Sequence, residues 1–182
     1  MSERRGARIV SVAIGLVLVS LLLVLLTASP NPSENADSPL LGQPAPAIET
    51  TTLKNEQFSL ARRKGSWVIL NFFNSTCVPC RNEHPLLLAF AAREASAPDP
   101  AELYTVINDD SDDAVAAYFQ TFGGDWPKLR DQNGAIAIAF GIAKVPETWI
   151  IDPNGYVRLR IAGQLSDGLL DEQLSALKLS FG

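Results

Sequence analysis

The chain has 182 residues, of which 47% are apolar, and a formal net charge of −5 with one histidine and two cysteines. Because the net charge is negative and the longest basic run outside the N-terminus is the three residues Arg62–Lys64, the sequence argues against a nucleic-acid-binding surface. Two cysteines and one histidine also supply too few nitrogen and sulfur ligands for an ordinary four-coordinate zinc site.

The first element is an apolar segment without charged residues. Ile9 to Leu26 consists almost entirely of Val, Leu, Ile and Ala. As a helix it would span roughly 27 Å, close to the ~30 Å core of a bilayer. We predict a transmembrane signal-anchor at residues 9–28. The alternative, a cleaved signal peptide, normally has a shorter apolar region of about 7–15 residues. Three arginines precede the segment, which predicts a cytoplasmic N-terminus at residues 1–8 and an extracytoplasmic remainder.

The composition then changes twice. Residues 29–41 are rich in Pro, Ser and Asn and read as a linker. Residues 42–182 are long enough to form one domain with a proper core. Outside the cytoplasm the surroundings are oxidising, so a lone cysteine pair is either a structural disulfide or a redox couple.

Strand and helix patterns alternate along this domain. Trp67–Phe73 is apolar on both faces, which is typical of a central strand. Ser111 can cap a helix that ends at two glycines, and Asp-Pro-Asn-Gly is a strong hairpin signal. The predicted order is strand Trp67–Phe73, helix Leu86–Glu94, strand Glu102–Asn108, helix Ser111–Gly124, short helix or turn Asn133–Ile142, hairpin around Asp152–Gly155, and helix Ser166–Ser180. This order indicates a mixed, three-layer α/β domain.

Cys77 and Cys80 lie between the first strand and the first helix. If the helix begins at or just after Cys77, its free N–H groups favour a thiolate there and lower the pKa below the free value of about 8.5. Cys80 would lie one turn further, nearer the core, so we expect Cys77 to attack and Cys80 to resolve the mixed disulfide. A structural disulfide closing so short a loop would stabilise little.

Two separated stretches carry a family resemblance. WVILNFFNSTCVPCRNEHPLL, followed later by VPETWIIDPNGYVRLRIAG, resembles the thioredoxin-like, membrane-tethered thiol-disulfide oxidoreductases of the TlpA/ResA group. Within that group the chain is most similar to the DsbE/CcmG type of cytochrome c maturation. The likeness covers residues 42–163. It implies a thioredoxin fold, with a mixed central sheet and flanking helices, and dithiol-disulfide exchange that needs no cofactor or metal.

The resemblance also assigns residues around the cysteines. Pro146 matches the family's cis-proline, which implies that the backbone of Val145 binds an extended substrate. Glu83 and Glu147 match acidic residues that the family uses in proton transfer or in tuning the thiol pKa. Asn71 stands where general thioredoxins carry a buried Asp, so proton transfer would fall to one of these two glutamates.

The resemblance implies partners as well. The substrate would be an apocytochrome c, or an associated thiol protein, and a DsbD/CcdA-type membrane electron donor would re-reduce the pair. The N-terminal helix would sit in the lipid bilayer of the cell membrane, with the thioredoxin domain on the periplasmic or extracytoplasmic side. Thr76 and Lys144-Val145 depart from the family's Trp and from the Gly-Ala of the DsbE/CcmG type. A general TlpA/ResA-like reductase or oxidase is therefore an alternative.

Two alternatives come from other functional classes. One is a thioredoxin-fold binding module without turnover, and the other is a copper carrier that would use His84. We expect His84 to be a partly exposed helix residue instead. Arg158 and Arg160 alternate along a strand and are expected on its solvated face, and Trp126 and Trp149 in the core or at its rim.

Overall fold

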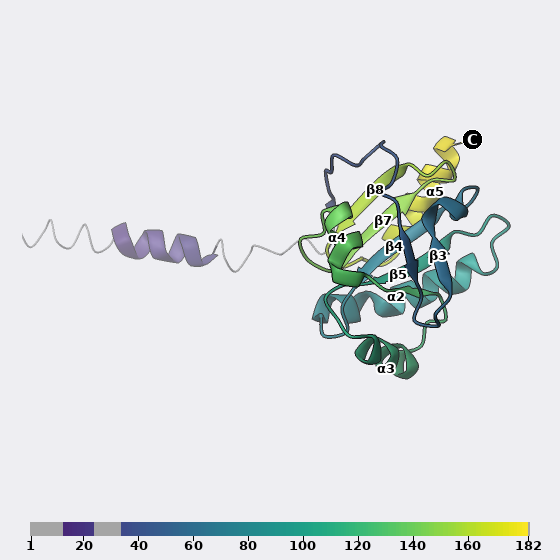
Figure 1. Ribbon diagram of the computed structural model, residues 1–182. Helices are drawn as coiled ribbons and strands as arrows, with labels where there is room; N and C mark the ends of the chain where they lie inside the picture. Colours follow the sequence, from purple (N-terminus) through teal and green to yellow (C-terminus); the bar gives the residue numbers. More distant parts are fainter. Residues whose placement is uncertain (1–12, 24–33, 182) are drawn as a thin grey trace, which may run out of the picture. The chain divides into compact units, whose positions relative to one another are not determined.

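The computed structural model describes residues 13–23 and 34–181, which belong to two separate compact units (Figure 1). Residues 13–23 are helical. Within the described residues, none of the helices is both long and apolar enough to cross a membrane. The anchor predicted at residues 9–28 lies partly outside the described residues, and it stays a prediction.

A six-stranded mixed sheet forms the centre of the second unit, in the order β1-β8-β7-β4-β5-β6. The strand β4 pairs in parallel with β5 and antiparallel with β7, and β5 pairs in parallel with β6. The hairpin strands β7 and β8 are antiparallel, and β1 adds to β8 at the edge. The strands are β1 Glu34–Asn35, β4 Val68–Phe73, β5 Glu102–Ile107, β6 Lys128–Leu129, β7 Glu147–Ile151 and β8 Val157–Ala162.

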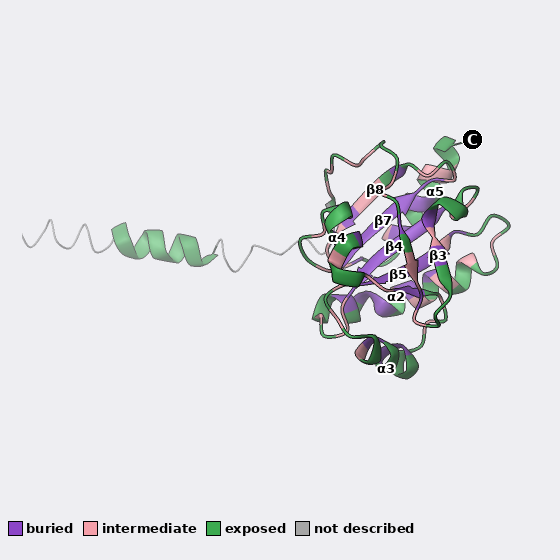
Figure 2. Cartoon of the chain, in the orientation of Figure 1, coloured by how far each residue is buried: buried purple, intermediate pink, exposed green. Residues whose placement is uncertain are grey.

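Both faces of the sheet are covered, so β4 is buried along its whole length (Figure 2). Successive side chains of a strand point to opposite faces of the sheet. Alternate residues of β4 therefore belong to two different hydrophobic clusters, one on each face. On one face, β4 residues pack with α4, Ala135–Phe140, and with a small β-hairpin. On the other face they pack with α2, Val78–Glu94, and α5, Leu169–Phe181. Fully burying a side chain such as Phe72 stabilises the fold by roughly 1.5–3 kcal/mol.

A third cluster joins the sheet to α3, Asp112–Phe122. It is continuous with the cysteine region, because Cys80 belongs to it together with Phe73 of β4 and Ile107 of β5. From α3 it takes Val115, Tyr118 and Phe119.

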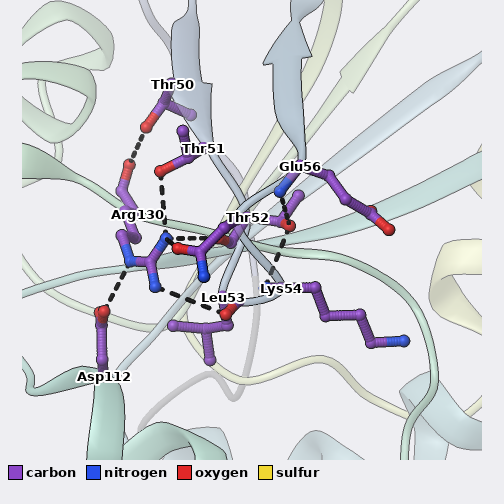
Figure 3. A network of polar contacts seen from close by, with 9 residues as sticks. Thr50, Thr51, Thr52, Leu53, Lys54, Glu56, Asp112 and Arg130 are labelled. Carbon is purple, nitrogen blue, oxygen red and sulfur yellow. Dashed lines mark hydrogen bonds and ion pairs between the residues drawn. The ribbon is translucent and has the colours of Figure 1, made fainter.

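Arg130 fastens the small hairpin, which consists of β2, Glu49–Thr51, and β3, Gln57–Ser59. Its guanidinium donates to the carbonyl oxygen of Thr52 at 2.5 Å and to Asp112 at the start of α3, also at 2.5 Å (Figure 3). This hairpin has no clear signal in the sequence, because each strand is only three residues long and every residue of β2 is polar.

The predicted elements are present, with shifted ends. The main difference is α2, which begins at Val78, eight residues before the predicted start. Pro79 lies in its first turn, where a missing N–H costs nothing, and Pro85 lies inside the helix without ending it. The predicted cap Ser111 accepts from the N–H of Ala114 at 3.2 Å. The short segment predicted at Asn133–Ile142 contains the 3-10 turn Gln132–Gly134 followed by α4. A further 3-10 turn spans Leu60–Arg63.

Candidate active site

Cys77 and Cys80 lie where the carboxyl end of β4 leads into α2, and they form a disulfide with Cα atoms 5.3 Å apart. Cys77 is the N-cap residue of α2, and its Sγ accepts from the backbone N–H of Cys80 at 3.2 Å. Its side chain is half-buried, whereas Cys80 is completely buried. The sulfur of Cys77 is therefore the accessible one, and the helix terminus is oriented to stabilise a negative charge on it.

The segment before β7 lies against this sulfur. Val145 and Pro146 are joined by a cis peptide bond. The carbonyl oxygen of Val145 is 3.6 Å from Sγ of Cys77. The fold thus brings together, from 68 residues apart, the cysteine and the proline segment that the sequence analysis singled out.

Glu83 lies on α2 one turn beyond Cys80 and is completely buried. Its Oε1 accepts from Nδ2 of Asn71 at 2.8 Å, and its Oε2 accepts from the N–H of Leu165 at 2.8 Å. Burial disfavours the carboxylate and raises the pKa of Glu83 to about 7, although both hydrogen bonds oppose the shift. Asn71 also donates to Thr148 Oγ1 at 3.1 Å. A carboxyl group in this position exchanges its proton near neutral pH.

Glu147 follows Pro146 directly, but its surroundings differ from those of Glu83. Its two oxygens accept from Nε and Nη2 of Arg160 at 2.9 and 2.8 Å. This bidentate pair raises the pKa of Arg160. Glu147 thus contacts a cation, whereas the oxygens of Glu83 accept only from the neutral N–H groups of Asn71 and Leu165.

The prediction of a solvated strand face holds for Arg158, whose side chain is exposed, but was wrong for Arg160, which is largely covered. Arg160 pairs with buried Glu147, and Arg158 Nε donates at 2.6 Å to Asp152, which is also buried. The hairpin register explains the first pair, since Arg160 lies opposite Trp149 on the same face as Glu147. The sequence did contain a signal for this ion pair, because Glu147 and Arg160 fall on the same face of the predicted hairpin.

The prediction of a partly exposed His84 was also wrong, because the side chain is only 3% exposed. Its Nε2 lies 3.1 Å from the carbonyl oxygen of Gly123, and its ring packs on Tyr118, Phe119 and Trp126. Burial lowers the pKa of His84. Here the histidine joins α2 to the end of α3. Trp149 lies in the core as predicted.

Comparison with known proteins agrees with this geometry. Residues 41–160 match the AhpC/TSA family. The chain is 31% identical over 141 residues to the thiol:disulfide interchange protein HelX of Rhodobacter capsulatus, covering 76% of this chain and 77% of HelX. It is 31% identical over 147 residues to DsbE of Escherichia coli, covering 79% and 76% of the two chains.

A solved structure has the same fold. The thioredoxin-family thiol:disulfide interchange protein from Chlorobium tepidum superposes with a TM-score of 0.66 at 27% identity, covering 78% of this chain and 98% of the other. With the cysteine pair placed as described above, the chain is a protein dithiol-disulfide oxidoreductase rather than a binding module. It belongs to the AhpC/TSA family and, within it, to the thiol-disulfide oxidoreductases of the HelX, ResA and DsbE type.

Proposed function

We propose that this oxidoreductase is a reductase of apocytochrome c thiols, or of an associated thiol protein, in cytochrome c maturation. One observation supports its chemistry above all: the sulfur of Cys77 caps α2 beside Val145 and is accessible, while Cys80 is completely buried. Cys77 is the attacking thiol in this proposal, and Cys80 is the resolving thiol.

The cycle starts from the reduced pair. The thiolate of Cys77 attacks a substrate disulfide, which forms a mixed disulfide and releases one substrate thiolate. The thiolate of Cys80 then attacks Sγ of Cys77, which forms the Cys77–Cys80 disulfide and releases the second substrate thiolate. Two electrons pass from the protein to the substrate, and the released thiolates take up two protons.

Glu83 has the proton-transfer role in this proposal. Cys80 must lose a proton before it can attack, and it is buried away from water. Glu83 lies one helical turn away with a pKa of about 7, so it can accept and return a proton near neutral pH. Glu147, which pairs with Arg160 and directly follows Pro146, is assigned the tuning of the thiol pKa in this proposal rather than the transfer of the proton.

The backbone of Val145 is the proposed substrate-binding edge. Its carbonyl oxygen already lies beside Cys77, so an extended substrate lying along Val145 and Pro146 would bring its sulfur to the attacking atom. Backbone recognition of this kind binds an unfolded segment and does not depend on its side chains.

The cellular setting is part of the proposal. The signal-anchor at residues 9–28 would hold the domain on the extracytoplasmic side of the cell membrane. The predicted linker at residues 29–41 is shorter than expected, because Glu34 and Asn35 form β1 of the sheet and Leu40 and Leu41 pack against the core. A reductase in that oxidising compartment needs electrons from the cytoplasm, and a DsbD/CcdA-type membrane electron donor would supply them. The alternative is a general TlpA/ResA-like reductase or oxidase. It stays open because Thr76 stands directly before the first cysteine, where the family has a tryptophan.

The reduction potential separates these functions. It is measured by equilibrating the full chain in glutathione or dithiothreitol buffers and trapping the free thiols. A potential near or below about −220 mV, toward that of thioredoxin, supports a reductase. A potential near about −120 mV marks an oxidant and would exclude the cytochrome role.

Trapping identifies the client. Cys80→Ala leaves Cys77 free to form a mixed disulfide that cannot be resolved, so non-reducing gels of whole membranes should contain adducts. Cys77→Ala is the matched control and should give none. Adducts to an apocytochrome c support the proposal. Adducts to many unrelated proteins would favour the general reductase, and an absence of adducts would contradict the assigned role of Cys77.

A further inference from the structure

The three residues before Cys77 form a turn that hydrogen bonds hold. The N–H of Cys77 donates to the carbonyl oxygen of Asn74 at 3.1 Å. The side-chain oxygen of Asn74 accepts from the N–H of Thr76 at 2.8 Å and from its hydroxyl at 2.6 Å. None of these three residues belongs to the apolar clusters of the core, so polar contacts decide where the segment lies.

Asn74 also reaches across to the loop that follows β5. Its Nδ2 donates to the carbonyl oxygen of Asn108 at 3.1 Å and to that of Asp109 at 2.7 Å. Asp109 has a left-handed backbone with φ of 47°, a conformation that aspartate and asparagine adopt more readily than other residues apart from glycine.

Asp110, in the same loop after β5, also contacts the turn. Its Oδ2 accepts from the N–H of Ser75 at 2.6 Å, and its Oδ1 accepts from the N–H of Ser111 at 2.8 Å. Ser111 caps α3, and the following residue, Asp112, is held by Arg130 (Figure 3). The loop that receives the turn is therefore fixed at its far end.

We propose that Asn74 and Asp110 are positioning residues for thiol-disulfide exchange. Together they clamp the turn before Cys77 onto the loop after β5 and so keep Sγ of Cys77 at the first turn of α2. The inference rests on the proposed role of Cys77 as the attacking thiol. Residue 76, directly before Cys77, is threonine, so no large aromatic side chain supports the turn there. In this proposal the polar contacts of Asn74 and Asp110 support the turn instead.

The consequence is a lower Cys77 pKa and a faster attack. Without the clamp, the sulfur would spend part of its time away from the N–H groups of the helix terminus, and the thiolate would lose that stabilisation. When the clamp is removed, we expect the pKa of Cys77 to rise by about one unit. We also expect its attack near neutral pH to slow about tenfold, a smaller loss than misplacing a reacting atom by about 1 Å can cause.

The experiment uses the full chain with Cys80→Ala, which leaves Cys77 as the single thiol. The rate of alkylation by iodoacetamide, followed against pH, gives the pKa and reactivity of Cys77. Asn74→Ala should raise this pKa. Asp110→Ala should raise it too, although the loss of a nearby negative charge by itself lowers a thiol pKa.

Two matched variants separate positioning from charge. Asp110→Asn keeps one acceptor oxygen, which can still bind the N–H of Ser75, but it removes the charge and the second acceptor, which binds the N–H of Ser111. The pKa should therefore stay at the parent value or fall below it. Asp109→Asn removes the neighbouring exposed charge without touching the clamp and should behave like Asp110→Asn. Thermal unfolding of each variant shows whether it is folded.

The results decide between the proposals. If Asn74→Ala and Asp110→Ala lower the melting temperature but leave the Cys77 pKa unchanged, the two residues are only structural and the inference is overturned. The same holds if Asp110→Ala and Asp110→Asn give equal pKa values. If the pKa is ordinary even with the clamp intact, this inference falls, whereas the attacking role of Cys77 is decided separately by the trapped adducts of Cys80→Ala.

Discussion

Glu83→Gln tests the strongest electrostatic feature of the site. Glu83 is completely buried, and its pKa in the fold is about 7, whereas its ordinary value is 4.5. Between these two pH values the unfolded chain loses the proton while the folded chain keeps it. Folding is therefore favoured at low pH, and this contribution is lost as the pH rises through about 7.

The magnitude follows from the two pKa values. A gap from 4.5 to about 7, at about 1.4 kcal/mol per pH unit, corresponds to roughly 3 kcal/mol of unfolding free energy. Glutamine carries no proton to lose, so the variant lacks this pH dependence. It also loses one acceptor, since both oxygens of Glu83 accept hydrogen bonds from Asn71 and Leu165, which costs about 1 kcal/mol at any pH.

Urea unfolding of the oxidised full chain, at several pH values between about 4 and 8, measures the effect. The stability of Glu83→Gln minus that of the parent should be slightly negative at the acid end. It should rise by roughly 3 kcal/mol toward the alkaline end. Glu172→Gln, at an exposed site on α5, is the control and should show a flat difference. A flat difference for Glu83→Gln as well would refute the argument from burial.

Other contacts give shorter predictions. Arg160→Gln should lower the unfolding free energy by about 3 kcal/mol in urea titrations, because it leaves the buried carboxylate of Glu147 without its cation. The double variant with Glu147→Gln should recover most of that loss, and no recovery would contradict the pairing. Arg130→Lys keeps the charge but not the planar set of donors, and should cost about 1–2 kcal/mol by the same assay. Gly124→Ala should cost roughly 2 kcal/mol, because φ is +106° and the added methyl would lie 2.9 Å from the ring of Trp126. An unchanged melting temperature would count against it.

The elements of the fold could be predicted from the sequence because their signals are local. The apolar run at Trp67–Phe73, the cap at Ser111 and the turn at Asp152–Gly155 each act through neighbours in the chain. The apolar pattern at Leu86–Glu94 covers only the later turns of α2, and Pro85 lies inside the helix. The observed start at Val78 agrees with the helix start just after Cys77 from which the thiolate was argued.

The cysteine pair was likewise predictable, since both thiols lie three residues apart after a buried strand. The family resemblance added Val145 and Pro146, which the structure places beside Cys77. Their closeness depends on chain segments 68 residues apart, and the local pattern around either segment does not contain that information.

The electrostatic character of the site was decided only by the tertiary structure. Both Glu83 and Glu147 match acidic residues of the family, yet one is buried against Asn71 and the other is neutralised by Arg160. The clamp of Asn74 on Asp109 likewise joins two loops 35 residues apart. A carboxylate's pKa and a loop's position depend on which groups surround them in space, and long-range pairing of strands and helices determines those groups. The sequence by itself therefore determined the reactive pair and the elements that carry it, while the folded chain decided that Glu83 is buried with a raised pKa and that Glu147 pairs with Arg160.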